Sequence, residues 1–189
     1  MTGFLIYVFV TSITPGPSNL FILNSSKEYG LSGAKKFICG VLAGFLFLAI
    51  ISIIFLFTLE ELIMKIEMFL KIFGFLYLIY LACKTYASTK TSINNETYLS
   101  FKSGFLLQIL NMKSLLFFVT LLGAFILPIS NMKITVYIYM AITVIIGWAC
   151  LLIWGILGNY LKEFLNRHNY IFKVIMSLLL LYSALNIFL

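Results

Sequence analysis

Acidic side chains are scarce in this chain, and aspartate is absent altogether. Only 10% of the 189 residues are charged, and the six acidic residues are glutamates that lie outside the long apolar runs. The one histidine, His168, has no neighbours that would complete a metal site. Because no histidine–carboxylate cluster and no metal-ligand spacing can be drawn, the sequence argues against an enzyme, a metal centre and a bound cofactor.

Cysteine is also rare. Cys39, Cys83 and Cys150 are odd in number, scattered, and placed within or at the ends of apolar runs. This pattern fits neither a disulfide framework nor a metal cluster. We predict that the three cysteines are small core residues.

Apolar residues make up 62% of the chain. This leaves too few polar residues to cover the surface of a soluble globule of this size. Six apolar runs are each near the ~20 residues that cross about 30 Å of hydrocarbon. They cover residues 4–23, 37–58, 68–83, 104–127, 134–157 and 171–189. The residues before the first run offer no basic region or cleavage site, so we expect that run to stay in the mature protein. The sequence predicts an all-α integral membrane protein with six transmembrane helices in a lipid bilayer.

The net charge of +7 is unevenly placed along the chain. Basic residues follow the first, third and fifth spans: Lys27, Lys35, Lys36, Lys84, Lys90, Lys102, Lys162, Arg167 and Lys173. By the positive-inside rule these three links are cytoplasmic, and both termini are then outside. The first link, residues 24–36, is short, so the first two spans should form a helical hairpin. We interpret the basic groups as orientation signals rather than as a nucleic-acid site.

A single long polar tract, residues 88–100, divides the chain into two halves. We predict a first three-helix repeat over 1–87, a cytoplasmic linker over 88–100 and a second three-helix repeat over 101–189. Because each half has an odd number of spans, the second enters the membrane in the opposite sense. This predicts a 3+3 inverted repeat, an architecture that places its binding site near the midplane where broken helices meet.

The first apolar run is interrupted by Thr14, Pro15, Gly16, Pro17, Ser18 and Asn19. The two prolines have no N–H, so the carbonyls of Thr11 and Ile13 lose their helical partners. Broken backbone at membrane depth is tolerated only where it is buried in protein or lines a watery cavity. Pro17 can begin a second half-helix, whose first N–H groups form a positive pole. The motif therefore predicts a binding site.

The fourth run places Lys113 deep in the membrane, close to Gln108 and Asn111. A lysine there costs around 2.5 to 3.5 kcal/mol on insertion scales, so it should face the interior and bind an anionic group. A structural role remains an alternative, in which the ammonium snorkels or binds carbonyls. Any one of the polar residues alone would be typical of helix packing. Their closeness to Lys113 and to the broken helix favours a site.

The chain resembles the lysine exporter (LysE/RhtB) family of bacterial amino-acid exporters. The resemblance covers nearly the whole chain and lies in Thr14-Pro15-Gly16-Pro17 with Asn19, Gly40 and Gly44, residues 70–78, residues 101–105, Asn111-Met112-Lys113 and Phe117-Phe118. It implies six helices, a bacterial plasma membrane, a central site and amino-acid efflux. Met112 stands where the family's motif has proline, so we expect a mild break or none in the fourth span. The second span lacks the acidic residue expected for cationic substrates.

The sequence thus predicts an alternating-access exporter of small, neutral amino acids or their derivatives. The substrate carboxylate would meet Lys113, Ser18 and Asn19, and its ammonium would meet Asn111, Gln108 and the freed carbonyl of Thr11 or Ile13. Two alternatives stay open: export of another small anionic or zwitterionic solute, and a membrane subunit that transports nothing. A homo-oligomer is compatible with the sequence.

Overall fold

The computed structural model describes residues 1–58, 72, 75–76, 79–80, 82–83, 86, 100–129, 132–167 and 169–185. Every regular element in this part of the chain is a helix, which confirms the all-α class. The elements are α1 (Thr2–Ile13), α2 (Pro17–Thr58), α4 (Phe101–Ile109), α5 (Met112–Leu121), the π-helix η1 (Leu122–Ile126), the 3-10 turn η2 (Leu127–Ile129), α6 (Lys133–Tyr160), α7 (Lys162–Arg167) and α8 (Asn169–Leu185). Most of the third apolar run and of the 88–100 linker lies outside the described residues.

Long apolar helices form the body of the protein. By length and composition, α2 and α6 can each cross a membrane, and α4 with α5 makes a third, bent span. The outer face of α6 exposes large apolar side chains, among them Ile134, Ile138 and Ile145, as suits a helix that faces lipid. These features support a helical membrane protein, and the count of six spans stays a prediction.

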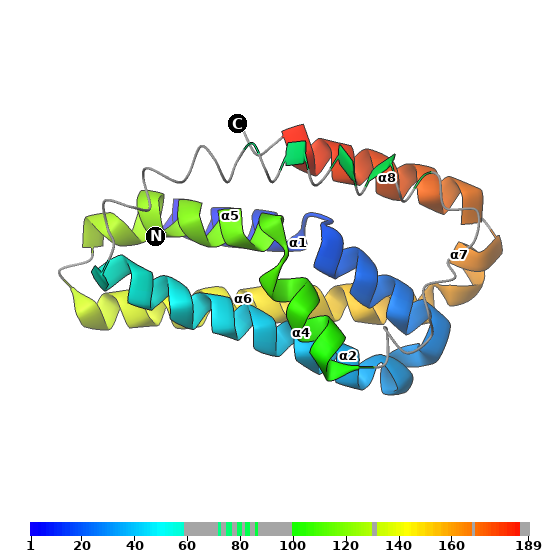
Figure 1. Ribbon diagram of the computed structural model, residues 1–189, viewed down its shortest axis with the longest axis horizontal. Coiled ribbons are helices and arrows are strands. Elements are labelled where there is room, and N and C mark those ends of the chain that lie inside the picture. The colour runs from blue at the N-terminus through cyan, green and yellow to red at the C-terminus, as the bar shows by residue number, and fades with distance from the viewer. Residues whose placement is uncertain are drawn as a thin grey trace.

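A turn at Gly30 divides α2 into two arms. Gly30 has φ +69° and ψ 170°, a backbone conformation that favours glycine. Beyond it, the N–H of Leu31 donates to Oδ1 of Asn159 on α6 at 3.3 Å. The predicted short link over residues 24–36 is therefore reduced to one non-helical glycine, and the two arms form the expected hairpin (Figure 1).

Glycines let α4 approach the second arm of α2 very closely. A Cβ on Gly40 would run into the carbonyl oxygen of Phe101, and a Cβ on Gly104 would run into that of Phe37. A Cβ on Gly44 would lie 3.0 Å from another α4 carbonyl oxygen. Small residues at such crossings allow backbone-to-backbone packing in membranes. Gly40, Gly44 and Gly104 therefore determine how closely α4 lies against α2.

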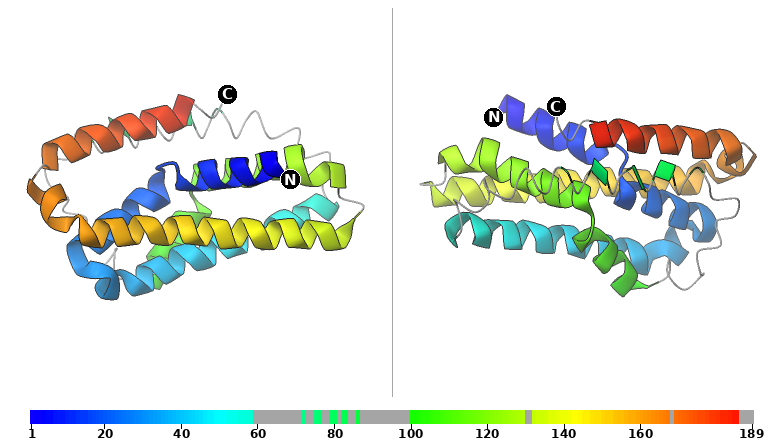
Figure 2. Two further views of the ribbon diagram at one scale, coloured as in Figure 1. Left: turned by 180° about the vertical axis from the view of Figure 1, so that it is seen from behind. Right: turned by 45° about the horizontal axis from the view of Figure 1, so that its top comes forward.

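The second arm of α2, α5, α6 and α8 run roughly along the long axis of the bundle, α4 crosses it obliquely, and both helix breaks lie near its middle (Figure 1). Figure 1 shows the Gly30 turn, the start of α4 and α7 at one end, with the N-terminus at the other. The reverse view in Figure 2 gives the same arrangement. The connections that carry Lys27, Lys102 and Arg167 therefore share one end of the bundle.

All three cysteines are free thiols. Cys150 is buried in α6, as predicted, whereas Cys39 and Cys83 are exposed. The prediction of a core position is wrong for these two. In a membrane protein an apolar surrounding sequence does not imply burial, because lipid covers the outward faces of the helices.

Candidate functional site

The chain leaves its helical course between α1 and α2, over residues 14–16. Pro17 is the first residue of α2, as predicted. Nδ2 of Asn19 donates to the carbonyl oxygens of Ser12, at 3.1 Å, and Thr14, at 2.9 Å. One amide therefore ties the start of α2 to the end of α1, so the break has a defined geometry.

The carbonyl of Ile13 finds its partner on another helix. Pro17 stands four residues later and has no N–H to donate. Instead, Nε1 of Trp154 on α6 donates to this oxygen at 3.1 Å. The break is thus stabilised by a hydrogen bond from α6 as well as by the amide of Asn19.

A second break separates α4 from α5. The two helices meet at 52°. Asn111 is the N-cap of α5, and its Oδ1 accepts from the N–H of Lys113 at 3.1 Å. The prediction of a mild break or none is therefore wrong. Met112 supplies no proline, but an asparagine cap satisfies the first N–H groups of a helix without one.

A buried polar network joins the two breaks. Oγ of Ser18 donates to Oε1 of Gln108 and accepts from Nδ2 of Asn111, the latter at 2.8 Å. Nε2 of Gln108 donates to Oγ of Ser114 at 2.9 Å. All four side chains are buried. The first turn of α2 is therefore bonded to residues on both sides of the second break.

Lys113 reaches from α5 to the first break. Its ammonium donates to the carbonyl oxygen of Thr14. Gly16 makes room for it, since a Cβ there would lie 2.6 Å from Cδ and 3.3 Å from Nζ of Lys113. Within the described part of the chain an ion pair joins Lys27 to Glu28, and none involves Lys113. The half-buried cation therefore has a neutral partner.

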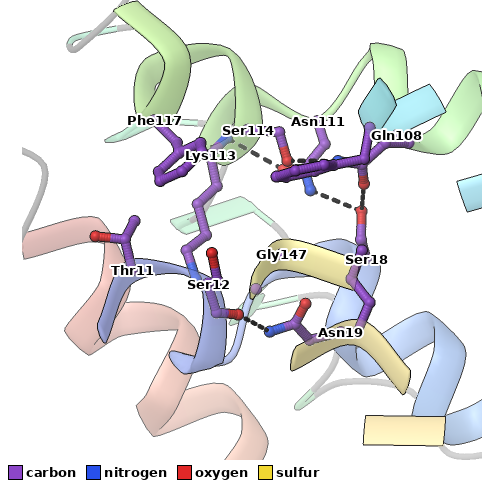
Figure 3. Close-up of a pocket in the computed structure, with 13 residues that line it drawn as sticks. Thr11, Ser12, Ser18, Asn19, Gln108, Asn111, Lys113, Ser114, Phe117 and Gly147 are labelled. Atoms are coloured by element: carbon purple, nitrogen blue, oxygen red, sulfur yellow. Dashed lines mark hydrogen bonds between the residues drawn. The ribbon is translucent and has the colours of Figure 1, made fainter. Parts of the chain in front are cut away.

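These groups surround a cavity, shown in Figure 3. The space among them, opening included, is about 380 Å³. It is lined by Thr11, Ser12, Gly16, Ser18, Asn19, Phe45, Gln108, Asn111, Lys113, Ser114, Phe117, Gly147 and Leu151.

The structure brings most of the predicted site residues together. Gly16, Ser18, Asn19, Gln108, Asn111 and Lys113 line the cavity. Thr14 offers its carbonyl, and Pro15 and Pro17 shape the break without lining the cavity. Ser12 and Ser114 were missed, although they are polar residues next to the two motifs, and Thr11 was considered only for its carbonyl. The apolar lining was also missed as part of the site, although Phe117 belongs to a motif of the resemblance; no motif marks Phe45, Gly147 or Leu151.

Two oxygen atoms of the lining are left for a ligand. Oγ of Ser12 is buried and has no hydrogen-bond partner in the structure. The amide nitrogen of Asn19 is used at the break, while no hydrogen bond to its Oδ1 is found among the described residues. Figure 3 shows both side chains on the side of the cavity near the Lys113 ammonium. The site thus combines one cation with hydrogen-bond acceptors that can bind an ammonium.

Two broken helices around a polar cavity, inside a bundle with apolar outer faces, define a membrane transport protein rather than an enzyme. A family model described as LysE type translocator matches residues 9–189. The chain belongs to the LysE type translocators, and the resemblance inferred from its motifs is confirmed.

Curated relatives span the whole chain. Proteins named Cysteine/O-acetylserine efflux protein from Escherichia coli strain K12, Escherichia coli O139:H28 and Shigella flexneri serotype 5b are each 28% identical over 189 residues. The alignments cover 100% of this chain and 97% of each relative. No solved structure matches.

Proposed function

We propose that this protein is a secondary transporter that exports small, neutral amino acids or their derivatives from the cytoplasm of a bacterium. Amino-acid efflux is supported by relatives named for cysteine and O-acetylserine export that align with the full chain. The observation that carries the proposal is the position of Lys113. This cation comes from the second half of the chain and meets the broken helix of the first half in a polar cavity.

The substrate carboxylate binds the ammonium of Lys113. In the structure this ammonium donates a hydrogen bond to a neutral group, the carbonyl of Thr14. A carboxylate is a stronger acceptor, and opposite charges attract far more strongly in a poorly hydrated site than in water. The carboxylate therefore competes well for the cation.

The substrate ammonium binds Oγ of Ser12 and Oδ1 of Asn19. This assignment differs from the predicted one. Gln108 and Asn111 are engaged with Ser18 and its network, and the Ile13 carbonyl is bonded to an indole. Oγ of Ser12 and Oδ1 of Asn19 belong to residues that line the cavity, and neither atom has a hydrogen-bond partner among the described residues.

A neutral substrate fits the charges of the cavity. Its lining holds one cation and no carboxylate. A zwitterion can pair its carboxylate with that cation and satisfy its ammonium with neutral oxygens. The extra side-chain cation of lysine or arginine would be desolvated near Lys113 with no opposite charge beside it, which is costly.

The arrangement of the two halves supports alternating access. Each half begins with a broken helix, at residues 14–16 in the first and at Leu110–Asn111 in the second. An inverted 3+3 repeat would rock about the cavity between these breaks. The basic connections at Gly30, at the start of α4 and at α7 share one end of the bundle, which we assign to the cytoplasm (Figure 1). Both termini are then outside.

Transport by purified protein in liposomes tests this proposal. We expect saturable uptake of labelled cysteine, serine and O-acetylserine, with uptake of lysine and glutamate at least about tenfold slower, because the first three are small zwitterions. Protein-free liposomes give the background. Lactate, a carboxylate without an ammonium, tests the anion-export alternative. Equal rates for lysine and cysteine would contradict the neutral-substrate assignment, and no uptake of any amino acid would contradict the function.

Substituting Ser12 by alanine tests the ammonium site. We expect Ser12→Ala to raise KM for cysteine about tenfold or more, since a hydrogen bond to a charged group contributes about 1.5 to 3 kcal/mol. Ser26→Ala is a matched control, because Oγ of Ser26 is also buried without a partner but lies outside the cavity lining. Both variants should keep their thermal stability. Equal KM values for the two variants would remove Ser12 from the site.

A further inference from the structure

The cavity lining includes an apolar wall. It is formed by Phe45 on α2, Phe117 on α5 and Leu151 on α6, and each is at most 6% exposed. In an amino-acid site this wall is where the substrate side chain must rest, because the other surfaces of the cavity are polar.

A glycine on the facing helix leaves the space that the Phe45 ring occupies. A Cβ on Gly147 would lie 2.6 Å from both Cε1 and Cζ of the Phe45 ring. Only a residue without a side chain therefore allows the ring to lie where it does. One residue further along α6, Nε1 of Trp148 donates to the carbonyl oxygen of Leu42 on α2 at 3.0 Å. This bond fixes the two helices beside the ring.

Neighbouring rings limit the movement of Phe45. Its centroid lies 6.0 Å from that of Phe117 and 5.1 Å from that of Phe118. The latter two rings pack edge to face at 5.1 Å. Phe45 and Phe118 are both buried. A close-packed wall of this kind yields little to a larger ligand.

We propose that Phe45, held in position by Gly147, sets the upper size of the substrate side chain. This inference rests on the proposed function and names the part of the site that selects among neutral amino acids. The polar groups recognise what all such substrates share. The ring excludes side chains of the size of phenylalanine, tyrosine or tryptophan and accepts those up to the size of O-acetylserine.

Two substitutions should shift selectivity in opposite directions. Phe45→Ala opens space beside the substrate, and we expect it to raise the phenylalanine-to-cysteine ratio of kcat/KM by about tenfold or more, the usual range for size discrimination by an apolar pocket. Gly147→Ala adds a methyl group to the cavity lining and displaces the ring. It should lower the O-acetylserine-to-cysteine ratio by about threefold to tenfold. Phe45→Leu provides a milder enlargement if the alanine variant does not fold.

Gly155→Ala is the control, because it adds the same methyl group to the same helix against Ile22, outside the cavity lining. Its ratios should equal those of the unaltered protein. Uptake in liposomes is paired with a second measurement, the shift in melting temperature caused by each amino acid in detergent. If the unaltered protein takes up and binds cysteine but the ratios of the Phe45 and Gly147 variants do not move, this inference is overturned and the proposed function stands. If the unaltered protein neither binds nor transports any of these amino acids, both are overturned.

Discussion

Replacing Lys113 with methionine is expected to reduce cysteine transport at least about 30-fold. Loss of one partner from a buried, hydrogen-bonded charge pair costs about 2 kcal/mol or more, and each 1.36 kcal/mol is about tenfold in rate. Methionine has a similar length and is apolar, so it fills the same space without an ammonium. Uptake by purified protein in liposomes, at matched protein content, measures the effect.

The folded state should survive this change. The ammonium of Lys113 makes one hydrogen bond, to the carbonyl of Thr14, and that oxygen also accepts from Asn19. Removing a charge that is costly to place within a membrane offsets the lost bond. We expect the melting temperature to stay unchanged or to rise. Lys102→Met, at an exposed position at the start of α4, is the control and should transport normally. Unimpaired transport by Lys113→Met would remove this lysine from the mechanism.

Adding one methyl group at Gly104 is expected to destabilise the protein by about 3 kcal/mol or more, which is the upper end of overpacking effects. A Cβ at this position would run into the carbonyl oxygen of Phe37 and lie 3.1 Å from the backbone nitrogen of Val41. Backbone atoms cannot turn aside as a flexible side chain can. Helix α4 would therefore have to move away from α2 as a whole.

Thermal unfolding of Gly104→Ala in detergent measures this loss, with Gly123→Ala as the control. Among the described residues, no atom outside the local backbone lies within 4 Å of a Cβ at Gly123. The free energy of unfolding of the control should stay within about 1 kcal/mol of that of the unaltered protein, the usual range for glycine-to-alanine changes in helices. Equal melting temperatures for the two variants would show that the α2–α4 crossing is less tight than the structure has it.

The first break was predictable because local chemistry determines it. Two prolines around Gly16 cannot continue a helix in lipid, and Pro17 starts a new one. A deep lysine without a carboxylate in its span likewise had to face the interior. These are properties of short stretches of sequence, so a single chain reveals them.

The second break was predicted less well because two kinds of residue can support it. Proline at position 112 would favour a break, and its absence suggested a continuous helix. Asn111 caps α5 instead, with its Oδ1 on the N–H of Lys113. A capping asparagine in an apolar run resembles an ordinary helix-packing residue until its partners are known.

The apolar wall and the hydrogen-bond partner of the Ile13 carbonyl could not be predicted from the sequence. Phe45 meets Gly147, and Trp154 meets Ile13, across distances along the chain that no spacing encodes. Nearly every position of these helices is apolar, so helical periodicity does not separate the faces that meet other helices from those that meet lipid. Such pairs depend on how the helices cross.

The hydrogen bonds of the two tryptophans have a practical consequence. The chain contains two tryptophans, and both donate from α6 to carbonyls in the first part of the chain, Trp148 to Leu42 and Trp154 to Ile13. Any rearrangement that separates α6 from α1 or α2 must break one of these bonds and change the surroundings of an indole. Intrinsic fluorescence therefore offers a label-free test of the alternating access proposed above, and substituting either tryptophan by phenylalanine assigns the signal to the contact of α6 with α2 or to that with α1.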